Sequence, residues 1–227
     1  MKYRILLSDA DGTLFDFHKG EEIAIRDTFR HFGIPTDEKT IGLYLEANAA
    51  LWKKLERGET TQAQLRVQRF VDFLALSGLE GDAQAISDEY VYQLGQQRWP
   101  LPYAKELCEQ VSAHMPIWIV TNGISQIQRS RFSDCALTPY FSGMVVSEEI
   151  GASKPDPAML FEALRQTGIA PEEAILLGDS VTADIAAANN AGVKSILFTN
   201  GKEPPENHGA TWTVKTLEEA LALILAE

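Results

Sequence analysis

Two carboxylates close to the start of the chain have the spacing of a catalytic pair. Asp9 and Asp11 follow the apolar run at residues 5–7, so in extended backbone both side chains point to the same side. One carboxylate of such a pair can attack phosphorus as a nucleophile, while the other, if its surroundings raise its pKa, can protonate the leaving oxygen. Gly12 lets the chain turn away abruptly after the strand. The competing interpretation of residues 9–13 is an ordinary Asp-Gly turn.

A second acidic pair lies late in the chain, where Asp179 follows an apolar run and Asp184 comes five residues later. A hard cation such as Mg²⁺ is typically held by one or two carboxylates together with water and substrate phosphate. Asp9 and Asp179 meet that need, and we predict a magnesium site that uses Asp9, Asp11 and Asp179. Asp184 could orient metal-bound water or Lys154 from behind. The alternative for Asp184 is a carboxylate favoured by the positive end of a helix.

Two further loops carry groups that suit a phosphate. Thr121 offers a hydroxyl and, with Asn122 and Gly123, backbone N–H groups near a predicted helix start, which is a natural cradle for phosphate oxygens. A plain helix N-cap is the alternative for this loop. The proline after Lys154 favours extended backbone, and we expect the Lys154 ammonium to be free on a loop, where it neutralises charge on the phosphate and on Asp9. Taken alone, Lys154 would be interpreted as a solvated surface lysine.

Short apolar runs that end in polar or glycine residues precede these loops. Such runs are typical of buried parallel strands, and helix-like stretches alternate with the later ones at residues 157–166 and 181–191. The pattern predicts an α/β fold with a Rossmann-like, doubly wound parallel sheet. Ligands bind beyond the carboxyl ends of the strands in such sheets, so the four loops can share one site. The predicted strands cover residues 3–8, 116–120, 143–147, 174–178 and 194–198.

A long helical segment separates the first strand from the rest of the sheet. It is rich in Ala, Leu, Gln and Glu, with apolar residues at helical spacing. Breaks are expected at Gly58, which precedes a capping box from Thr61 to Gln64, and around residues 78–81. We therefore predict an all-helical domain at residues 17–97, inserted into a catalytic core that is formed by residues 1–16 and 98–227.

The charge of the chain limits its partners. A formal net charge of -12 disfavours a nucleic-acid polymer, because such binding needs clustered Lys and Arg. A small phosphorylated metabolite stays possible, since one metal ion and one lysine can reverse the local field in a cleft. The sequence leaves open whether the chain is a monomer or a homodimer.

The chain shows no sign of a membrane or secretory segment. No basic start leads into an apolar run, and no stretch of about 18 apolar residues occurs, so we expect a cytoplasmic protein that does not associate with membranes. The two cysteines, Cys108 and Cys135, lie in stretches with helical character and have no Cys or His partners at metal-ligand spacing. We expect reduced, half-buried thiols.

Taken together, the segment DADGT at residues 9–13, the loop at Thr121, Lys154 and the segment GDSVTAD at residues 178–184 resemble the four signature motifs of the haloacid dehalogenase superfamily of phosphatases. The match spans the whole predicted core, and the helical insertion resembles the cap domain of early-cap members. The resemblance implies a magnesium-dependent phosphatase with a covalent phospho-aspartate. The roles it implies are nucleophile for Asp9, general acid and base for Asp11, phosphate binding for Thr121 and Lys154, magnesium ligation for Asp179, and support of that ligand for Asp184.

Longer segments narrow the resemblance. WIVTNGISQIQRSR, VVSEEIGASKPDP and GDSVTADI resemble the bacterial nucleoside 5'-monophosphatases of the pyrimidine-nucleotidase, house-cleaning type, and NAALWKKLERGETT resembles their cap. The resemblance implies nucleoside 5'-monophosphates as substrates. Phe17 and Trp52 are then candidate surfaces for stacking a base, although a Trp in an amphipathic helix more often belongs to the core.

Other activities stay open at this point. Related members of the superfamily act on sugar phosphates or phosphoglycolate, and a phosphomutase forms the same phospho-aspartate but returns the phosphate to a sugar. Asp11 argues against haloacid dehalogenase activity, because the dehalogenases of the superfamily lack an aspartate there. A non-enzymatic receiver module also clusters acidic residues, a Thr and a Lys around an aspartate, but receivers are shorter and have no helical insertion.

Overall fold

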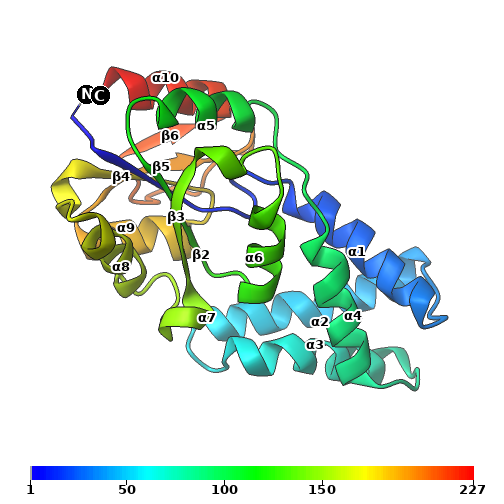
Figure 1. Cartoon of the computed structure of the whole chain (residues 1–227). Helices are drawn as coiled ribbons and strands as arrows, with labels where there is room; N and C mark the ends of the chain where they lie inside the picture. Colours follow the sequence, from blue (N-terminus) through cyan, green and yellow to red (C-terminus); the bar gives the residue numbers. More distant parts are fainter. Residues whose placement is uncertain (1) are drawn as a thin grey trace.

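A single parallel sheet lies at the centre of the computed structural model, which describes residues 2–227 (Figure 1). Its strands lie in the order β3-β2-β1-β4-β5-β6, and all the neighbouring pairs are parallel. The chain moves outward from β1 to β3 on one side and from β4 to β6 on the other. The carboxyl ends of β1 and β4 therefore flank the point where the winding reverses, which is where α/β sheets bind ligands. The strands are β1 Ile5–Ser8, β2 Ile117–Thr121, β3 Phe141–Val146, β4 Ala174–Gly178, β5 Lys194–Phe198 and β6 Trp212–Val214.

The prediction of a doubly wound parallel sheet is confirmed, and the five predicted strands are all present. β1, β2 and β4 are buried along their whole length, which is why their sequences are continuous apolar runs. The sequence analysis misses β6. This strand of three residues lies at the edge of the sheet and only its last residue is buried, so it leaves no apolar run to detect.

Helices cover both faces of the sheet. Because alternate strand residues point to opposite faces, Leu6 and Ile119 belong to one apolar cluster and Leu7 and Val120 to the other. The first cluster is closed by α5 and α10, and the second by α8 and α9. Among the helices described between residues 2 and 227, none is long and apolar enough to cross a bilayer. The bounds are α5 Ala104–Ser112, α8 Ala158–Thr167, α9 Ala186–Ala191 and α10 Leu217–Ala226.

Four helices fill the interval between β1 and α5 and form most of a third apolar cluster, which Ile124 and Ile127 at the start of α6, Ser125–Ser133, complete (Figure 1). The rings of Phe29, Tyr44, Phe70 and Phe73 lie in this cluster, and Phe29 stacks on Phe73 with 4.8 Å between ring centroids. The insertion also packs on the core, because α4 contacts α6. The four helices are α1 Phe17–His31, α2 Glu38–Glu56, α3 Gln62–Ser77 and α4 Ala83–Gly95.

The predicted breaks between these helices are confirmed. Gly58 lies in the turn after α2, and the capping box joins Thr61 and Gln64 at the start of α3. Gly78 then ends α3 with a φ of 69°, in the left-handed region that glycine adopts without strain. The assignment of residues 17–97 to a separate domain stays a prediction.

The two thiols differ in part from the prediction. Cys108 is fully buried inside α5 rather than half-buried, and burial raises the pKa of its thiol to about 12. Cys135 is half-buried as predicted, but it lies in the bend after α6 rather than in a helix. Both cysteines are free thiols.

Candidate active site

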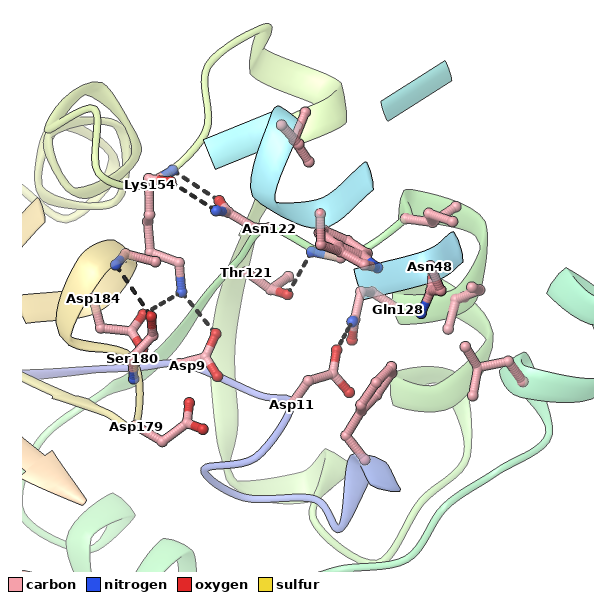
Figure 2. A pocket seen from close by; sticks show the side chains of 18 of the residues that line it. Asp9, Asp11, Asn48, Thr121, Asn122, Gln128, Lys154, Asp179, Ser180 and Asp184 are labelled. Atoms are coloured by element: carbon pink, nitrogen blue, oxygen red, sulfur yellow. Dashed lines mark hydrogen bonds and ion pairs between the residues drawn. The ribbon is translucent and has the colours of Figure 1, made fainter. Parts of the chain in front are cut away.

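A cavity of about 250 Å³ opens where the carboxyl ends of β1, β2 and β4 meet the helical insertion. Figure 2 shows Lys154, Asp184 and Asp179 on one side of this space and Asn48, from the insertion, on the other. The structure thus brings together the four loops that the sequence analysis selects. The predicted site residues that line the cavity are Asp9, Asp11, Thr121, Asn122, Gly123, Lys154, Asp179 and Asp184.

Asp9 lies directly after β1, at the centre of the site, and only 7% of it is exposed. Its Oδ1 accepts a hydrogen bond from Lys154 Nζ at 2.7 Å, and its Oδ2 accepts one from Thr13 Oγ1 at 3.2 Å. Burial raises the pKa of the Asp9 carboxyl well above its usual value, and the Lys154 charge opposes that rise. Lys154 and Thr13 therefore fix the orientation of the Asp9 carboxylate, which depends on nearby positive charge to stay ionised.

The Lys154 ammonium is buried, with 1% of the residue exposed, so the prediction of a free ammonium on a loop is wrong. Besides Asp9, it donates to Asp184 Oδ1 at 2.6 Å and to the carbonyl oxygen of Val120 at 2.7 Å. Burial disfavours the charged form, but Asp184 and Asp9 outweigh burial and raise the pKa of Lys154 above its usual value. Since all three N–H donors are used, a phosphate group would share this ammonium with the carboxylates.

The loop after β2 positions Lys154. Asn122 exchanges two hydrogen bonds with the Lys154 backbone, because its Nδ2 donates to the carbonyl oxygen and its Oδ1 accepts from the N–H, both at 2.8 Å (Figure 2). Thr121 Oγ1 accepts from the Gly123 N–H at 3.0 Å, so the hydroxyl keeps its own proton for donation. The Gly123 N–H, which the sequence analysis assigns to the phosphate, is thereby used within the loop.

Three carboxylates meet at one side of the cavity (Figure 2). Asp9, Asp179 and Asp184 each offer an oxygen, and these oxygens all lie within 4.8 Å of one another. Three hard anionic ligands around a single ammonium leave negative charge in excess, which suits a divalent cation such as Mg²⁺. Although Asp179 is exposed at the cavity mouth, the surrounding protein and the Asp184 charge raise the pKa of its carboxyl to about 6. The donor set fits magnesium.

Two local features pack these acidic residues together. Gly12 has a φ of 88°, and a Cβ there would lie 2.5 Å from the Asp179 carboxylate, so glycine is required. Asp184 lies in a wide helical turn at Val181–Ile185 and accepts from the Ser180 N–H at 3.0 Å as well as from Lys154. Asp184 therefore contacts Lys154, one of the two partners that the sequence analysis allows for it, and also belongs to the acidic group.

The Asp11 carboxylate points away from the acidic group. It forms an ion pair with Arg131 and accepts a hydrogen bond from Gln128 Nε2 at 2.5 Å. Arg131 is itself fixed, since it lies over the Phe15 ring and donates to the carbonyl oxygen of Gln97 at 3.1 Å. The sequence analysis counts Asp11 among the magnesium ligands, but its carboxylate is not a member of the group of acidic residues described above. Its side chain is oriented by these two residues of α6 instead.

Sequence reasoning missed several polar residues at the site. Gln128 and Arg131 lie on the face of α6 that also carries the buried Ile127, so polar side chains on an otherwise apolar helix face were the signal. Asn48 and Arg69 line the cavity from the insertion, and Arg69 Nη1 donates to Asn48 Oδ1 at 3.4 Å. No spacing in the sequence indicates that these two meet, because they come from different helices.

The family of the chain follows from comparison with known proteins. The family model of the haloacid dehalogenase-like hydrolases matches residues 3–192. The chain belongs to this family. Pyrimidine 5'-nucleotidase PynA of Streptococcus pneumoniae is 33% identical over 201 residues, which cover 87% of this chain and 84% of PynA. Pyrimidine 5'-nucleotidase YjjG of Escherichia coli is 30% identical over 99% of either chain.

A solved structure of the same hydrolase family extends the comparison. The HAD-hydrolase YfnB of Bacillus subtilis, bound to magnesium, matches with a TM-score of 0.91 at 29% identity, over 99% of this chain and 100% of YfnB. The resemblance inferred from the four motifs is thus confirmed, and within the haloacid dehalogenase-like hydrolases the chain is a phosphatase.

Proposed function

We propose that this chain is a magnesium-dependent nucleotidase, which hydrolyses nucleoside 5'-monophosphates, pyrimidine ones above all, through a phosphate carried on Asp9. The observation that carries the proposal is one cavity in which a buried aspartate, bonded to Lys154, adjoins an acidic group suited to a divalent cation. The names of the relatives PynA and YjjG support a pyrimidine nucleotide as substrate.

In the first step, Asp9 attacks phosphorus in line with the leaving oxygen, and the bond between phosphorus and that oxygen breaks. Lys154 and the Thr121 hydroxyl stabilise negative charge on the equatorial oxygens. Asp11, two residues further along the loop, donates a proton to the leaving oxygen, so the nucleoside departs as a neutral alcohol. Gln128 and Arg131 orient the Asp11 side chain through their bonds to its carboxylate.

In the second step, water attacks the phosphate on Asp9 while Asp11 accepts its proton. Phosphate leaves and the Asp9 carboxylate is restored. Asp9 and Asp179 would hold a magnesium ion, whose positive charge would stabilise the negative charge of the phosphate group. Lys154 stays bonded to Asp184 through this cycle and so keeps the nucleophile in a fixed orientation.

The helical insertion, residues 17–97, is proposed to act as a cap domain that excludes bulk water and contacts the leaving group. Phe17 and Trp52 line the cavity together with Leu55 and Leu94. A base is a flat and largely apolar ring, so Phe17 and Trp52 are the proposed stacking surfaces. Trp52 also packs against the buried leucines of α2 and α3.

A substrate panel with purified protein tests the proposal. The panel contains the monophosphates of uridine, cytidine, thymidine, adenosine and guanosine, ribose 5-phosphate and phosphoglycolate, each assayed with Mg²⁺ and in excess chelator. We expect the highest kcat/KM for pyrimidine nucleotides and no turnover in chelator. Turnover of sugar phosphates without any nucleotide would reject the nucleotidase assignment, and full activity in chelator would reject the metal requirement. Phosphate recovered on a sugar instead of in water would indicate a phosphomutase.

A further inference from the structure

A buried polar cluster in the helical insertion adjoins the end of the cavity remote from Asp9. Its members come from all four helices of the insertion, and each is at most 6% exposed. Burying polar groups among apolar side chains costs free energy of folding unless the groups are hydrogen-bonded, so such a cluster suggests a functional role. The members are Glu21, Tyr44, Asn48, Arg69 and Tyr90.

The hydrogen bonds of the cluster form a chain of donors and acceptors that leads from Arg69 through Asn48 to Glu21. Asn48 Nδ2 donates to Glu21 Oε1 at 2.8 Å, and the hydroxyls of Tyr44 and Tyr90 donate to the same oxygen at 3.4 and 3.5 Å. Asn48 Oδ1 then accepts from Arg69 Nη1 at 3.4 Å. A carboxylate only accepts and a guanidinium only donates, so Glu21 and Arg69 fix which way the Asn48 amide faces. The cluster is a support for the Arg69 side chain.

Arg69 is held on further sides, but one of its three nitrogens has no hydrogen-bond partner in the described part of the chain. Its guanidinium lies over the Tyr90 ring, 4.4 Å from the centroid, and its Nε donates to the Arg66 carbonyl oxygen at 3.3 Å. Its Nη2 is buried and has no hydrogen-bond partner within residues 2–227. Arg69 also lines the cavity. A buried, unpaired N–H donor at the wall of a binding cavity indicates a ligand acceptor at that position.

We propose that Arg69 is a specificity residue, whose Nη2 donates to the 2-carbonyl oxygen of the pyrimidine base in the substrate. The inference rests on the proposed nucleotidase function and names the contact that selects the base. Uracil, thymine and cytosine share this carbonyl oxygen, whereas adenine has no carbonyl oxygen. A guanidinium carries donors only, so it favours such an acceptor and gains nothing from an amino group in its place.

The remaining groups of the substrate have other partners in the cavity, so the base is the group that Arg69 would contact. The phosphate has its own ligands in Lys154 and Thr121 at the strand ends, and the apolar rings of Phe17 and Trp52 lie on the same cavity. Glu21, connected to Arg69 through Asn48, balances the guanidinium charge from within the insertion. This balance reduces the attraction of Arg69 for a dianionic phosphate and suits it to a neutral carbonyl.

The test compares substrates that share the phosphate but differ in the base. Arg69→Lys keeps the charge but loses the planar pair of donors, so kcat/KM for uridine and cytidine 5'-monophosphates should fall about 10- to 100-fold. Ribose 5-phosphate, which has no base, and adenosine 5'-monophosphate should change by no more than about twofold. Arg66→Lys is the matched control, because Arg66 lies one turn earlier on α3, bonds Asp88 and Gln126, and does not line the cavity. This control should behave as wild type.

A second variant tests the support of Arg69. Asn48→Ala removes the acceptor that holds Arg69 Nη1, so the same two pyrimidine nucleotides should lose activity while ribose 5-phosphate does not. A merely structural role of Asn48 would lower all three alike. Unchanged turnover of ribose 5-phosphate also shows that each variant is folded.

Three results would overturn the inference. An equal loss for ribose 5-phosphate would mean that Arg69 acts on the phosphate or on folding, and no loss for any nucleotide would mean that it contacts none. A loss for uridine but not cytidine 5'-monophosphate would move the contact to the 4-carbonyl. In each case wild-type protein still hydrolyses nucleotides, so the proposed function stands. Failure of that function is visible separately, as wild-type protein that hydrolyses no nucleotide.

Discussion

The two ends of the cavity are built in different ways. At the strand ends, Asp9, Lys154 and Asp184 are almost fully buried and are joined by short bonds between opposite charges. At the insertion, Phe17 and Trp52 line the cavity together with Arg69, whose Nη2 has no hydrogen-bond partner in the part of the chain that the structure describes. Under the proposed function, every phosphate ester presents the same group to the first end, whereas the second end meets the variable part of the substrate. Changes at the strand ends should therefore affect all substrates, and changes at the insertion only some of them.

The largest effect is expected at the nucleophile. Asp9→Asn should reduce turnover of every substrate by about 10⁴-fold or more, because an amide is a poor nucleophile. Initial rates with uridine 5'-monophosphate and ribose 5-phosphate measure this. The melting temperature is the folding control, since Lys154 keeps its bond to Asp184 in the variant. If Asp9→Asn lost activity on nucleotides but not on ribose 5-phosphate, the strand ends would not act on all substrates alike, and the contrast between the two ends of the cavity would be wrong.

The acidic group should give the next largest effect. Asp179→Asn removes one anionic ligand, so the Mg²⁺ concentration for half-maximal activity should rise about 100-fold for nucleotide and sugar phosphate alike. Titration of activity with Mg²⁺ measures this shift. Asp72→Asn is a suitable control, because Asp72 bonds Gln68 on α3 and does not line the cavity. An unchanged Mg²⁺ requirement would place the metal elsewhere.

A smaller and selective effect is expected from the stacking surface. Trp52→Leu should raise KM for nucleotides about 5- to 100-fold, as for the loss of other base–aromatic contacts, and leave ribose 5-phosphate almost unchanged. Trp99→Leu serves as control, because Trp99 is 41% exposed and outside the cavity lining. Equal KM changes for both substrates would show that Trp52 belongs to the core of the insertion only.

The smallest effect concerns stability and pH. Burial raises the pKa of Glu21, although Arg69 opposes the rise, so the folded chain binds this proton more tightly than the unfolded chain. The free energy of unfolding should therefore fall as pH rises from the ordinary value of 4.5 through the raised value. Glu21→Gln has no such proton to lose. Between pH 4.5 and pH 8, the melting temperature of the wild type should therefore fall by a few degrees more than that of the variant. Calorimetry at both pH values measures the difference, and parallel pH curves would contradict it.

The sequence predicts part of the strand-end half of the site well, because Asp9 and Asp179 directly follow buried strands and Thr121 is the last residue of another. The apolar runs give the strands, and the parallel topology brings their carboxyl ends together, so Asp9, Thr121 and Asp179 were found without coordinates. The environment of Lys154 was predicted wrongly. Its burial results from long-range contacts with Asp9 and Asp184, which no local pattern indicates.

The insertion was predicted as helices, with Phe17 and Trp52 as candidate stacking surfaces, but its polar residues at the cavity were not predicted. Capping and glycine signals gave the breaks at Gly58 and Gly78, since these act within a few residues. Asn48 and Arg69 were missed because their meeting depends on how α2 packs on α3. The orientation of Asp11 was also missed, because Gln128 and Arg131 reach it from a helix far along the chain.

Trapping of the phosphoenzyme tests most directly that the phosphate is carried on Asp9. Asp11→Asn should lower kcat about 10²- to 10⁴-fold, the usual worth of acid–base assistance. The leaving group of p-nitrophenyl phosphate hardly needs a proton. With this substrate, Asp11→Asn should slow the attack of Asp9 on phosphorus less than the hydrolysis of the phosphate on Asp9, so the phosphoenzyme should accumulate. After rapid quench of a single turnover, mass analysis of peptides should find the phosphate on Asp9. Phosphate on Asp11, or no covalent phosphate in either wild type or variant, would contradict the account and favour direct attack by water.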